Sequence, residues 1–98
     1  MYQRLIDKAK REATFSLYGV LGEDIPGNRV AQDIASADER VDTIHLLINS
    51  NGGSVSEGLS IVSAIVSARA YVHAHINGVA ASMAAVIAVS ADKVSMQD

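Results

Sequence analysis

The stretch Asn77-Gly-Val-Ala-Ala-Ser-Met-Ala-Ala85 places one serine among side chains of almost no bulk. The residues from Tyr71 to Asn77 predict a strand, and those from Ala80 to Ser90 predict a helix. Ser82 would therefore lie where the unpaired N–H groups and the positive dipole end of a helix point outward. That position suits an oxygen nucleophile, because the Met83 backbone N–H could stabilise the oxyanion formed when a hydroxyl attacks a carbonyl. The alternative is a small-residue turn that lets a helix pack close to a sheet.

A second stretch, Ile48-Asn-Ser-Asn-Gly-Gly-Ser-Val55, also follows an apolar strand and opens a helix. Paired glycines adopt backbone conformations that other residues resist, so that bare N–H groups can face a ligand. In a parallel α/β sheet, both stretches would leave the carboxyl ends of strands, where such folds build their sites. The N–H groups of Gly53 and Met83 would then form a two-donor oxyanion hole beside the Ser82 hydroxyl.

The rest of the sequence predicts strands and helices in alternation, and hence right-handed crossovers and a largely parallel sheet flanked by helices. Strands are expected over residues 14–20, 43–49 and 71–77 and from residue 93, and helices over residues 2–12, 28–37, 54–69 and 80–90. The run Ile44-His-Leu-Leu-Ile48 is typical of a strand that is covered on both faces. We expect one α/β domain over residues 1–98.

Helix ends and faces are predicted from local patterns. Asn28 is expected to cap its helix, and Ser54-x-x-Glu57 predicts a capping box for the next one. Arg69 is expected to face the negative dipole end of that second helix. Its apolar residues at helical spacing, with Gly58 on the same side, are Val55, Leu59, Val62, Ile65 and Val66.

Composition narrows the class of protein. With a net charge of −3 the chain gives no sign of a basic surface for phosphate groups, so nucleic acid is not expected as a partner. The absence of cysteine excludes disulfides and fits a reducing compartment. The amino terminus lacks the apolar core of a signal peptide, and the longest apolar run, around Val79 to Val89, is too short to span a bilayer. We therefore expect a cytoplasmic protein with no membrane segment.

The two motifs together resemble those of the ClpP-like serine peptidases. Ile48-Asn-Ser-x-Gly-Gly-Ser-Val55 is similar to the family's oxyanion segment, and Gly78-x-Ala-Ala-Ser-Met-Ala84 is similar to its nucleophile segment. The two occur in the family's order, and the likeness reaches back to about Tyr2. The resemblance implies a ClpP/crotonase-like fold of repeated ββα and βαβ units.

The same resemblance implies roles for individual residues. Ser82 would be the catalytic nucleophile, and the amides of Gly53 and Met83 would hold the oxyanion. The backbone around Ser54 and Val55 would pair with an extended peptide or unfolded protein substrate. The family also implies a homo-oligomeric ring and an AAA+ ATPase partner, with no cofactor and no metal.

Three departures from the family pattern are visible. Asn51 stands where the family has proline before its glycine pair, and His45 and Leu47 occupy positions that are often aromatic and dock ATPase loops. The family's catalytic histidine and aspartate lie downstream of the serine, but only 16 residues follow Ser82, and none is a histidine. We therefore expect a truncated, nucleophile-bearing part with little or no peptidase activity as the isolated chain.

Other residues offer weaker candidates. His73 and His75 share one strand face, too far back to serve as base for Ser82, and their spacing could bind a metal only with a third ligand, which is not apparent. Glu23 and Asp24 could be an acid pair, but beside proline and glycine they indicate a solvated loop.

Three other classes share part of the pattern. Signal-peptide-peptidase-like enzymes have a similar glycine pair and serine but use a downstream lysine as base. A non-catalytic structural subunit of a mixed ring would need only the glycine loop and helices. Crotonase-type enzymes share the sheet layout and an oxyanion hole, but the setting of Ser82 is better explained by a nucleophile.

Overall fold

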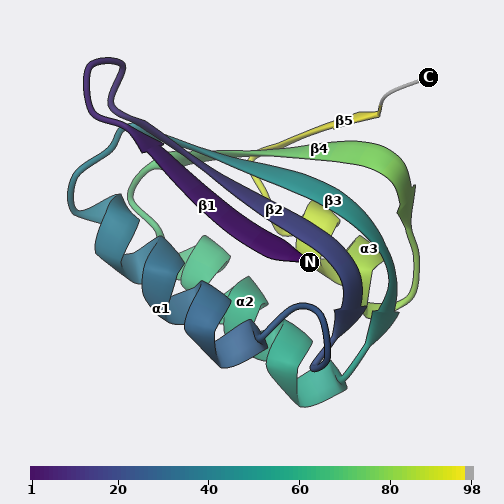
Figure 1. Ribbon diagram of the computed structural model, residues 1–98. Coiled ribbons are helices and arrows are strands. Elements are labelled where there is room, and N and C mark those ends of the chain that lie inside the picture. The colour runs from purple at the N-terminus through teal and green to yellow at the C-terminus, as the bar shows by residue number, and fades with distance from the viewer. Residues whose placement is uncertain (97–98) are drawn as a thin grey trace.

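The computed structural model describes residues 1–96, which form one mixed sheet with helices on one of its faces (Figure 1). Its strands are β1 (Tyr2–Asp7), β2 (Glu12–Leu21), β3 (Thr43–Gly53), β4 (Tyr71–Ala80) and β5 (Lys93–Met96). Its helices are α1 (Gly27–Asp38), α2 (Val55–Ser67) and α3 (Met83–Val89). The strands lie side by side in chain order, with β1 antiparallel to β2 and the other neighbours parallel. The predicted α/β class with a largely parallel sheet is confirmed.

Alternation of residue type builds the core between sheet and helices. In β2, the side chains of Ala13, Phe15 and Leu17 are buried, whereas Thr14 and Ser16 point to the other face and are half-buried. The same alternation buries every second residue of β3, and Val72 and Ala74 in the first half of β4, because successive strand side chains point to opposite faces. The core on the helix side also includes Ile25, Val30, Ile34, Ile44, Leu46, Ile48, Ile61, Ile65, Val72, Ala74, Met83 and Ile87.

The predicted helix over residues 2–12 is wrong, because this segment forms β1 and a hairpin turn into β2. Its spacing of charged and apolar residues fits a helix, but pairing with β2 satisfies its backbone and places Tyr2 and Ile6 against the core. The turn closes through Arg11, which has a φ of 56°. A pairing partner outside the segment therefore overrides the local pattern.

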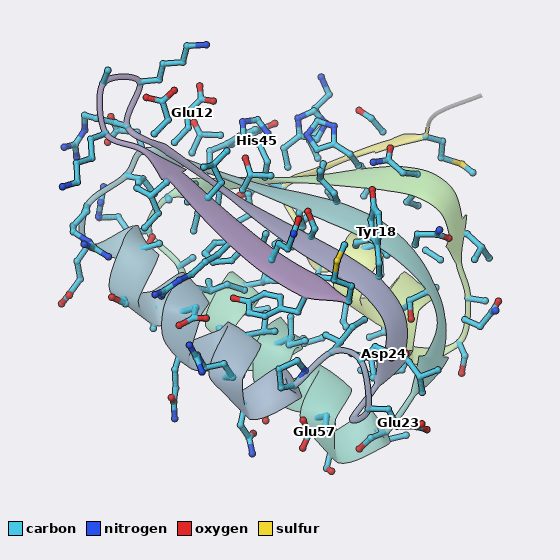
Figure 2. The ribbon with its side chains drawn as sticks, in the orientation of Figure 1. Glu12, Tyr18, Glu23, Asp24, His45 and Glu57 are labelled. Atoms are coloured by element: carbon cyan, nitrogen blue, oxygen red, sulfur yellow. The ribbon has the colours of Figure 1, made fainter. Side chains whose placement is uncertain are left out.

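Helix α1 is capped from another helix and not by Asn28. Its N-cap residue is Pro26, which offers no side-chain acceptor. The Glu57 carboxylate accepts a 2.6 Å hydrogen bond from the Gly27 N–H instead, as the position of Glu57 below the loop in Figure 2 illustrates. Only half of the predicted capping box forms, since Ser54 Oγ accepts from the Glu57 N–H at 3.3 Å but the Ser54 N–H donates elsewhere.

The buried face of α2 differs from the predicted one. Gly58 and Ile65 lie on the inner face as expected, together with Ile61. In contrast, Val55, Leu59 and Val66 are more than half exposed, and Val62 is only partly buried. Both faces of this helix carry apolar residues, so the sequence pattern did not distinguish the face that packs from the face that does not.

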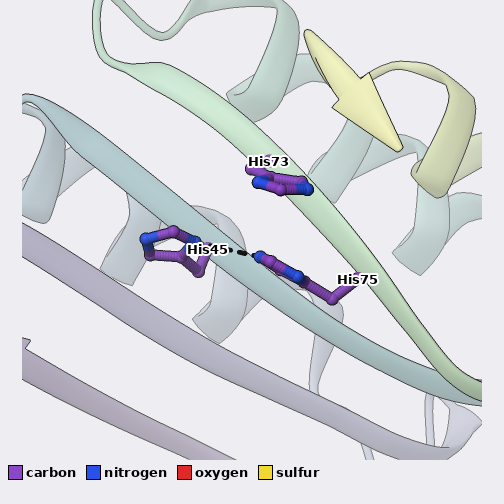
Figure 3. Close-up of side chains that lie close together, drawn as sticks. All are labelled: His45, His73 and His75. Atoms are coloured by element: carbon purple, nitrogen blue, oxygen red, sulfur yellow. Dashed lines mark hydrogen bonds between the residues drawn. The ribbon is translucent and has the colours of Figure 1, made fainter. Parts of the chain in front are cut away.

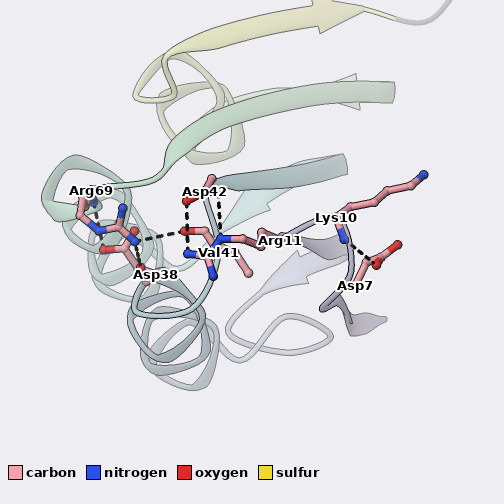
Figure 4. Close-up of polar contacts among 7 residues, drawn as sticks. All are labelled: Asp7, Lys10, Arg11, Asp38, Val41, Asp42 and Arg69. Carbon is pink, nitrogen blue, oxygen red and sulfur yellow. Dashed lines mark hydrogen bonds and ion pairs between the residues drawn. The ribbon is translucent and has the colours of Figure 1, made fainter.

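Polar contacts join the connectors at the end of the sheet where β2, β3 and β4 begin (Figure 4). The Arg69 side chain donates to the carbonyl oxygens of Asp38 at 2.8 Å and Val41 at 3.2 Å. Arg69 thus binds the end of α1, and not the end of α2 as predicted. Arg11 forms an exposed ion pair with Asp42 at 2.9 Å, which fixes the turn before β2 against the start of β3.

The second face of the sheet has no helix over residues 1–96. β3 is therefore covered on one face only, contrary to the expectation of two covered faces, and His45 and Leu47 remain half-buried there. Their apolar or weakly polar side chains explain why the strand resembles a fully enclosed one in sequence. Among the described helices, none combines the length and the apolar character needed to cross a membrane.

Candidate functional site

The two sequence motifs meet at the carboxyl ends of β3 and β4. The Ala81 N–H donates to the Ser50 carbonyl at 3.1 Å, which joins the two segments directly. A Cβ atom placed on Gly52 would lie 2.9 Å from Ser82 Cβ and 3.3 Å from the Met83 nitrogen. The glycine loop and the serine therefore share one site, as the parallel-sheet argument predicts.

Ser82 occupies a sharp turn between β4 and α3. β4 continues through Ala80 and α3 begins at Met83, so the helix starts later than the predicted Ala80. Ser82 is the N-cap residue, with φ 56° and ψ −129°, a region that residues with a side chain rarely adopt. Within residues 1–96 its exposed hydroxyl makes no hydrogen bond. Backbone strain of this kind concentrates at functional sites, and here it occurs at a serine that is exposed at the start of a helix.

The two loop glycines have different neighbours. Gly52 faces Ser82, whereas a Cβ on Gly53 would lie 2.5 Å from the Leu21 carbonyl oxygen, in neighbouring β2. Both have positive φ, of 109° and 140°. The sequence predicted a role for Gly53 only and did not predict that Gly52 is the glycine that lies next to Ser82. The missing signal is the register shift between Ile48 and Ser50, which sets how the loop turns toward β4.

Met83 is held in place by α2. Its side chain is 7% exposed and lies against Gly58, where an added Cβ would overlap Met83 Cγ. The close approach that the sequence predicts at Gly58 is therefore made to Met83. Because the side chain is enclosed, the Met83 backbone N–H is fixed next to Ser82.

Ser54 and Val55 lie at the start of α2, directly after the glycine loop. Ser54 is the N-cap residue, and its Oγ is 3.2 Å from Ser56 Oγ. Val55 is 61% exposed, so its side chain and backbone border the surface next to the loop. A groove near the same ends of the strands is lined by Tyr18, Gly19, Val20, Asn49, Ser50, Asn51 and Val79. The sequence did not predict that Tyr18, Gly19 and Val20 of β2 line this groove beside the two motifs.

Glu23 and Asp24 belong to the turn after β2 and are both exposed. Asp24 Oδ2 accepts from the Val20 N–H at 2.9 Å, which closes that turn. Figure 2 labels both residues near the carboxyl end of β2. The contacts fit the solvated-loop interpretation, with Asp24 in a structural role.

The three histidines lie together on the helix-free face of the sheet, and none hydrogen-bonds to Ser82 within residues 1–96. Their ring nitrogens instead contact one another, Glu12 and Ser95. The expectation that His73 and His75 lack a third neighbour is wrong, because His45 of β3 lies beside them. Burial lowers the pKa of His73 and of His75, which favours neutral rings in both.

Comparison with known proteins gives a consistent result. The family model described as Clp protease matches residues 2–97. The ATP-dependent Clp protease proteolytic subunit of Streptococcus mutans is 34% identical over 94 residues, which are 95% of this chain and 46% of that protein. The subunit of the same name from Streptococcus pyogenes has the same identity and coverage.

Solved structures agree with the sequence matches. ClpP1 from Listeria monocytogenes superimposes with a TM-score of 0.72 at 25% identity, over 80% of this chain and 46% of that one. An N165D mutant of the same protein gives a TM-score of 0.73 over 85% of this chain. The chain thus spans about half the length of the relatives it matches.

Proposed function

Since the chain belongs to the Clp protease family, a family of serine peptidases, we propose that it is the nucleophile-bearing part of a serine endopeptidase. Ser82 is the proposed nucleophile, which attacks a peptide carbonyl and forms an acyl-enzyme that water then hydrolyses. The observation that carries this proposal is the position of Ser82, exposed on a strained strand-to-helix turn against the Gly52 loop. The family match also favours this class over the signal-peptide-peptidase-like alternative.

The proposed oxyanion hole consists of the backbone N–H groups of Gly53 and Met83. Fixed donors stabilise the charge that develops on the carbonyl oxygen without reorganising during the reaction. Two features support this assignment: the Met83 nitrogen lies close to the glycine loop, and the buried Met83 side chain packs against Gly58 of α2, which restrains the start of α3. The backbone around Ser54 and Val55 is the proposed contact surface for an extended peptide, since it borders the same loop.

A general base is the component that Ser82 lacks within residues 1–96. A base must come within hydrogen-bond reach of the hydroxyl, and the three histidines are engaged elsewhere on the sheet. The proposal is therefore that the base is a histidine outside these 98 residues, and that the isolated chain has little or no peptidase activity.

A serine-reactive phosphonate tests the mechanism. We expect slow labelling of the 98-residue chain and rapid labelling of a chain extended by the residues that follow Asp98 in its coding sequence. Ser82→Ala should abolish the rapid labelling, whereas Ser90→Ala, at the other end of α3, should not change it. Equally rapid labelling of both chains would contradict the missing base, and rapid labelling that survives in Ser82→Ala would contradict Ser82 as the nucleophile. The absence of rapid labelling in the extended chain would support a non-catalytic structural subunit.

The proposal extends to assembly and partners. The relatives are named as proteolytic subunits of an ATP-dependent protease, and we propose that this protein forms a homo-oligomeric ring, uses an AAA+ ATPase partner, acts on peptides or unfolded proteins and is cytoplasmic. Light scattering on the extended chain tests the ring, since a monomer at micromolar concentration would contradict it. Cell fractionation tests the location.

A further inference from the structure

The three histidines of the chain converge on the helix-free face of the sheet (Figure 3). His45 of β3 and His73 of β4 are paired positions in the parallel register, and His75 follows two residues later on the same face. One ring nitrogen from each histidine lies within 4.8 Å of one from each of the others. The serine site does not use this cluster, which leaves its role to be explained.

We propose that His45, His73 and His75 together bind one divalent transition-metal ion, with zinc as the ion that best fits three imidazole ligands. Zinc sites with three histidines are tetrahedral and keep a water molecule in the fourth position. All three histidines are half-buried, so that an ion can reach them from solvent and retain such a water. Imidazole also binds copper, nickel and cobalt, which makes those ions useful probes.

The closest pair already has nearly the separation that an ion requires. His45 Nδ1 and His75 Nε2 are 3.0 Å apart. Two nitrogens on one tetrahedral zinc ion, each at about 2.05 Å, are about 3.3 Å from each other. An ion can therefore replace the hydrogen bond after a small separation of the rings. The His73 ring stacks on that of His75 with centroids 3.8 Å apart, and a rotation about its side-chain bonds turns a nitrogen toward the ion.

Glu12 orients the ring of His45 and favours one of its tautomers. A carboxylate only accepts hydrogen bonds, so His45 Nε2 carries the proton in its 3.2 Å contact with Glu12 Oε1. His45 Nδ1 then has a free lone pair, and His75 Nε2 donates to it. When an ion binds between His45 Nδ1 and His75 Nε2, the proton on His75 Nε2 is replaced by one on Nδ1 of the same ring. His75 remains neutral, and no net proton is released. Glu12 is thus placed as the outer carboxylate that orients a metal-binding histidine.

Ser95 of β5 provides a comparable contact for His73. Its Oγ lies 2.8 Å from His73 Nε2. In the tautomer that carries its proton on Nε2, His73 donates to Ser95 Oγ and keeps Nδ1 for the ion. Residues from four strands therefore contribute to the cluster and its outer contacts.

A bound ion would join β3 to β4 on the face that no helix covers. These two strands carry the Gly52 loop and Ser82 at their ends, so the metal would brace the scaffold of the serine site without touching it. Binding to the folded state alone raises stability with metal concentration. Metal-dependent stability is therefore the expected consequence.

Titration calorimetry with ZnCl2 on the metal-free 98-residue chain tests the proposal. We expect one ion per chain, and an affinity at least tenfold weaker for His45→Gln, His73→Gln and His75→Gln. Glu12→Gln should weaken zinc binding by about 10-fold or more, as loss of an outer carboxylate does in other sites. Its matched control is Glu23→Gln, at the opposite end of β2, which should leave the affinity unchanged.

Two further measurements distinguish loss of metal binding from misfolding of a variant. Circular dichroism should show the same fold in every variant without metal, and the same zinc concentration should raise the Tm of the parent chain more than that of the histidine variants. Co2+ should give the strong visible absorption of a four-coordinate site in the parent chain only. The proposal is overturned if zinc binds without a fixed stoichiometry, or if Glu12→Gln and Glu23→Gln bind it equally well.

Discussion

Gly52 and Ser82 lie so close together that a Cβ atom on the glycine would be 2.9 Å from the Cβ of the serine. The two residues come from loops that follow different strands, and their contact defines the geometry of the candidate site. Gly52 has a φ of 109°, a value that glycine adopts without strain. Both its conformation and its neighbour therefore require glycine at this position.

The first prediction concerns Gly52→Ala. We expect it to lower the free energy of unfolding by about 1–3 kcal/mol through backbone strain, as measured by urea denaturation, and to shift the amide NMR signals of Ser82 and Met83. Gly78→Ala is the control, because Gly78 has the same φ of 109° but faces the Asn49 side chain. Equal shifts at Met83 in the two variants would show that strain alone, and not the contact with Ser82, explains the effect.

The strained backbone of Ser82 leads to a second prediction. Ser82→Gly should be more stable than Ser82→Ala by about 1 kcal/mol, because glycine adopts φ 56° and ψ −129° freely whereas alanine retains the strain. Chemical denaturation of the two variants side by side gives the difference. A lower stability for Ser82→Gly would mean that the turn stores no strain.

The contact between Glu57 and Gly27 gives a third prediction. Glu57→Ala should destabilise the chain by about 1–2 kcal/mol, because the first turn of α1 loses its only side-chain acceptor in residues 1–96. Glu57→Gln should cost less, since an amide oxygen still accepts the bond. Glu39→Gln, at the other end of α1, should change stability by less than about 0.5 kcal/mol. A cost for Glu57→Ala as small as that of Glu39→Gln would rule out the cap.

Tyr2 provides a prediction about pH. Its hydroxyl donates to Asp33 Oδ2 at 2.7 Å, and burial, followed by the bond and the charge of Asp33, raises the Tyr2 pKa well above its usual value. Tyr2 therefore stays protonated in the folded state at a pH where the unfolded chain ionises it. Stability should fall as pH rises above about 10, because the unfolded state then binds fewer protons than the folded one.

Spectrophotometric titration and denaturation of the parent chain and of Tyr2→Phe test this effect. In the parent chain, Tyr2 should give a late component of the titration, and that component should be missing in Tyr2→Phe. The variant should also lose part of the stability decrease above pH 10. Tyr71→Phe, at an exposed position, should retain the late component, and its loss there would contradict the assignment.

Local sequence patterns predicted those parts of the fold whose structure depends on neighbours in the chain. The strand around Phe15 follows from its β-branched and aromatic residues, the strand that contains Ile48 follows from its apolar run, and the Ser54 cap follows from the residues beside it. β1 was missed because its pairing with β2 is a contact that no local pattern contains. The exposed side of α2 was missed for a different reason, since apolar residues such as Leu59 occur on both faces of that helix.

The site was predictable to a similar extent. The meeting of the glycine loop with Ser82 follows from parallel strands, which bring their carboxyl ends to one edge. The identity of Gly52 as the contacting residue depends on a register shift within the sheet, and the approach of His45 to His73 depends on the register of β3 and β4. Neither register is visible in the amino-acid sequence, so these two contacts required the structure.

The strands occupy the sheet in the order in which they occur in the chain. During synthesis on the ribosome, each new strand can therefore pair with the strand that precedes it in the chain. No strand has to insert between two strands that have already been synthesised. The amino-terminal hairpin can serve as the template on which β3, β4 and β5 are added in turn, as expected when chains fold from the amino terminus. Nascent chains of this protein should consequently gain protection from proteases in steps, one strand at a time.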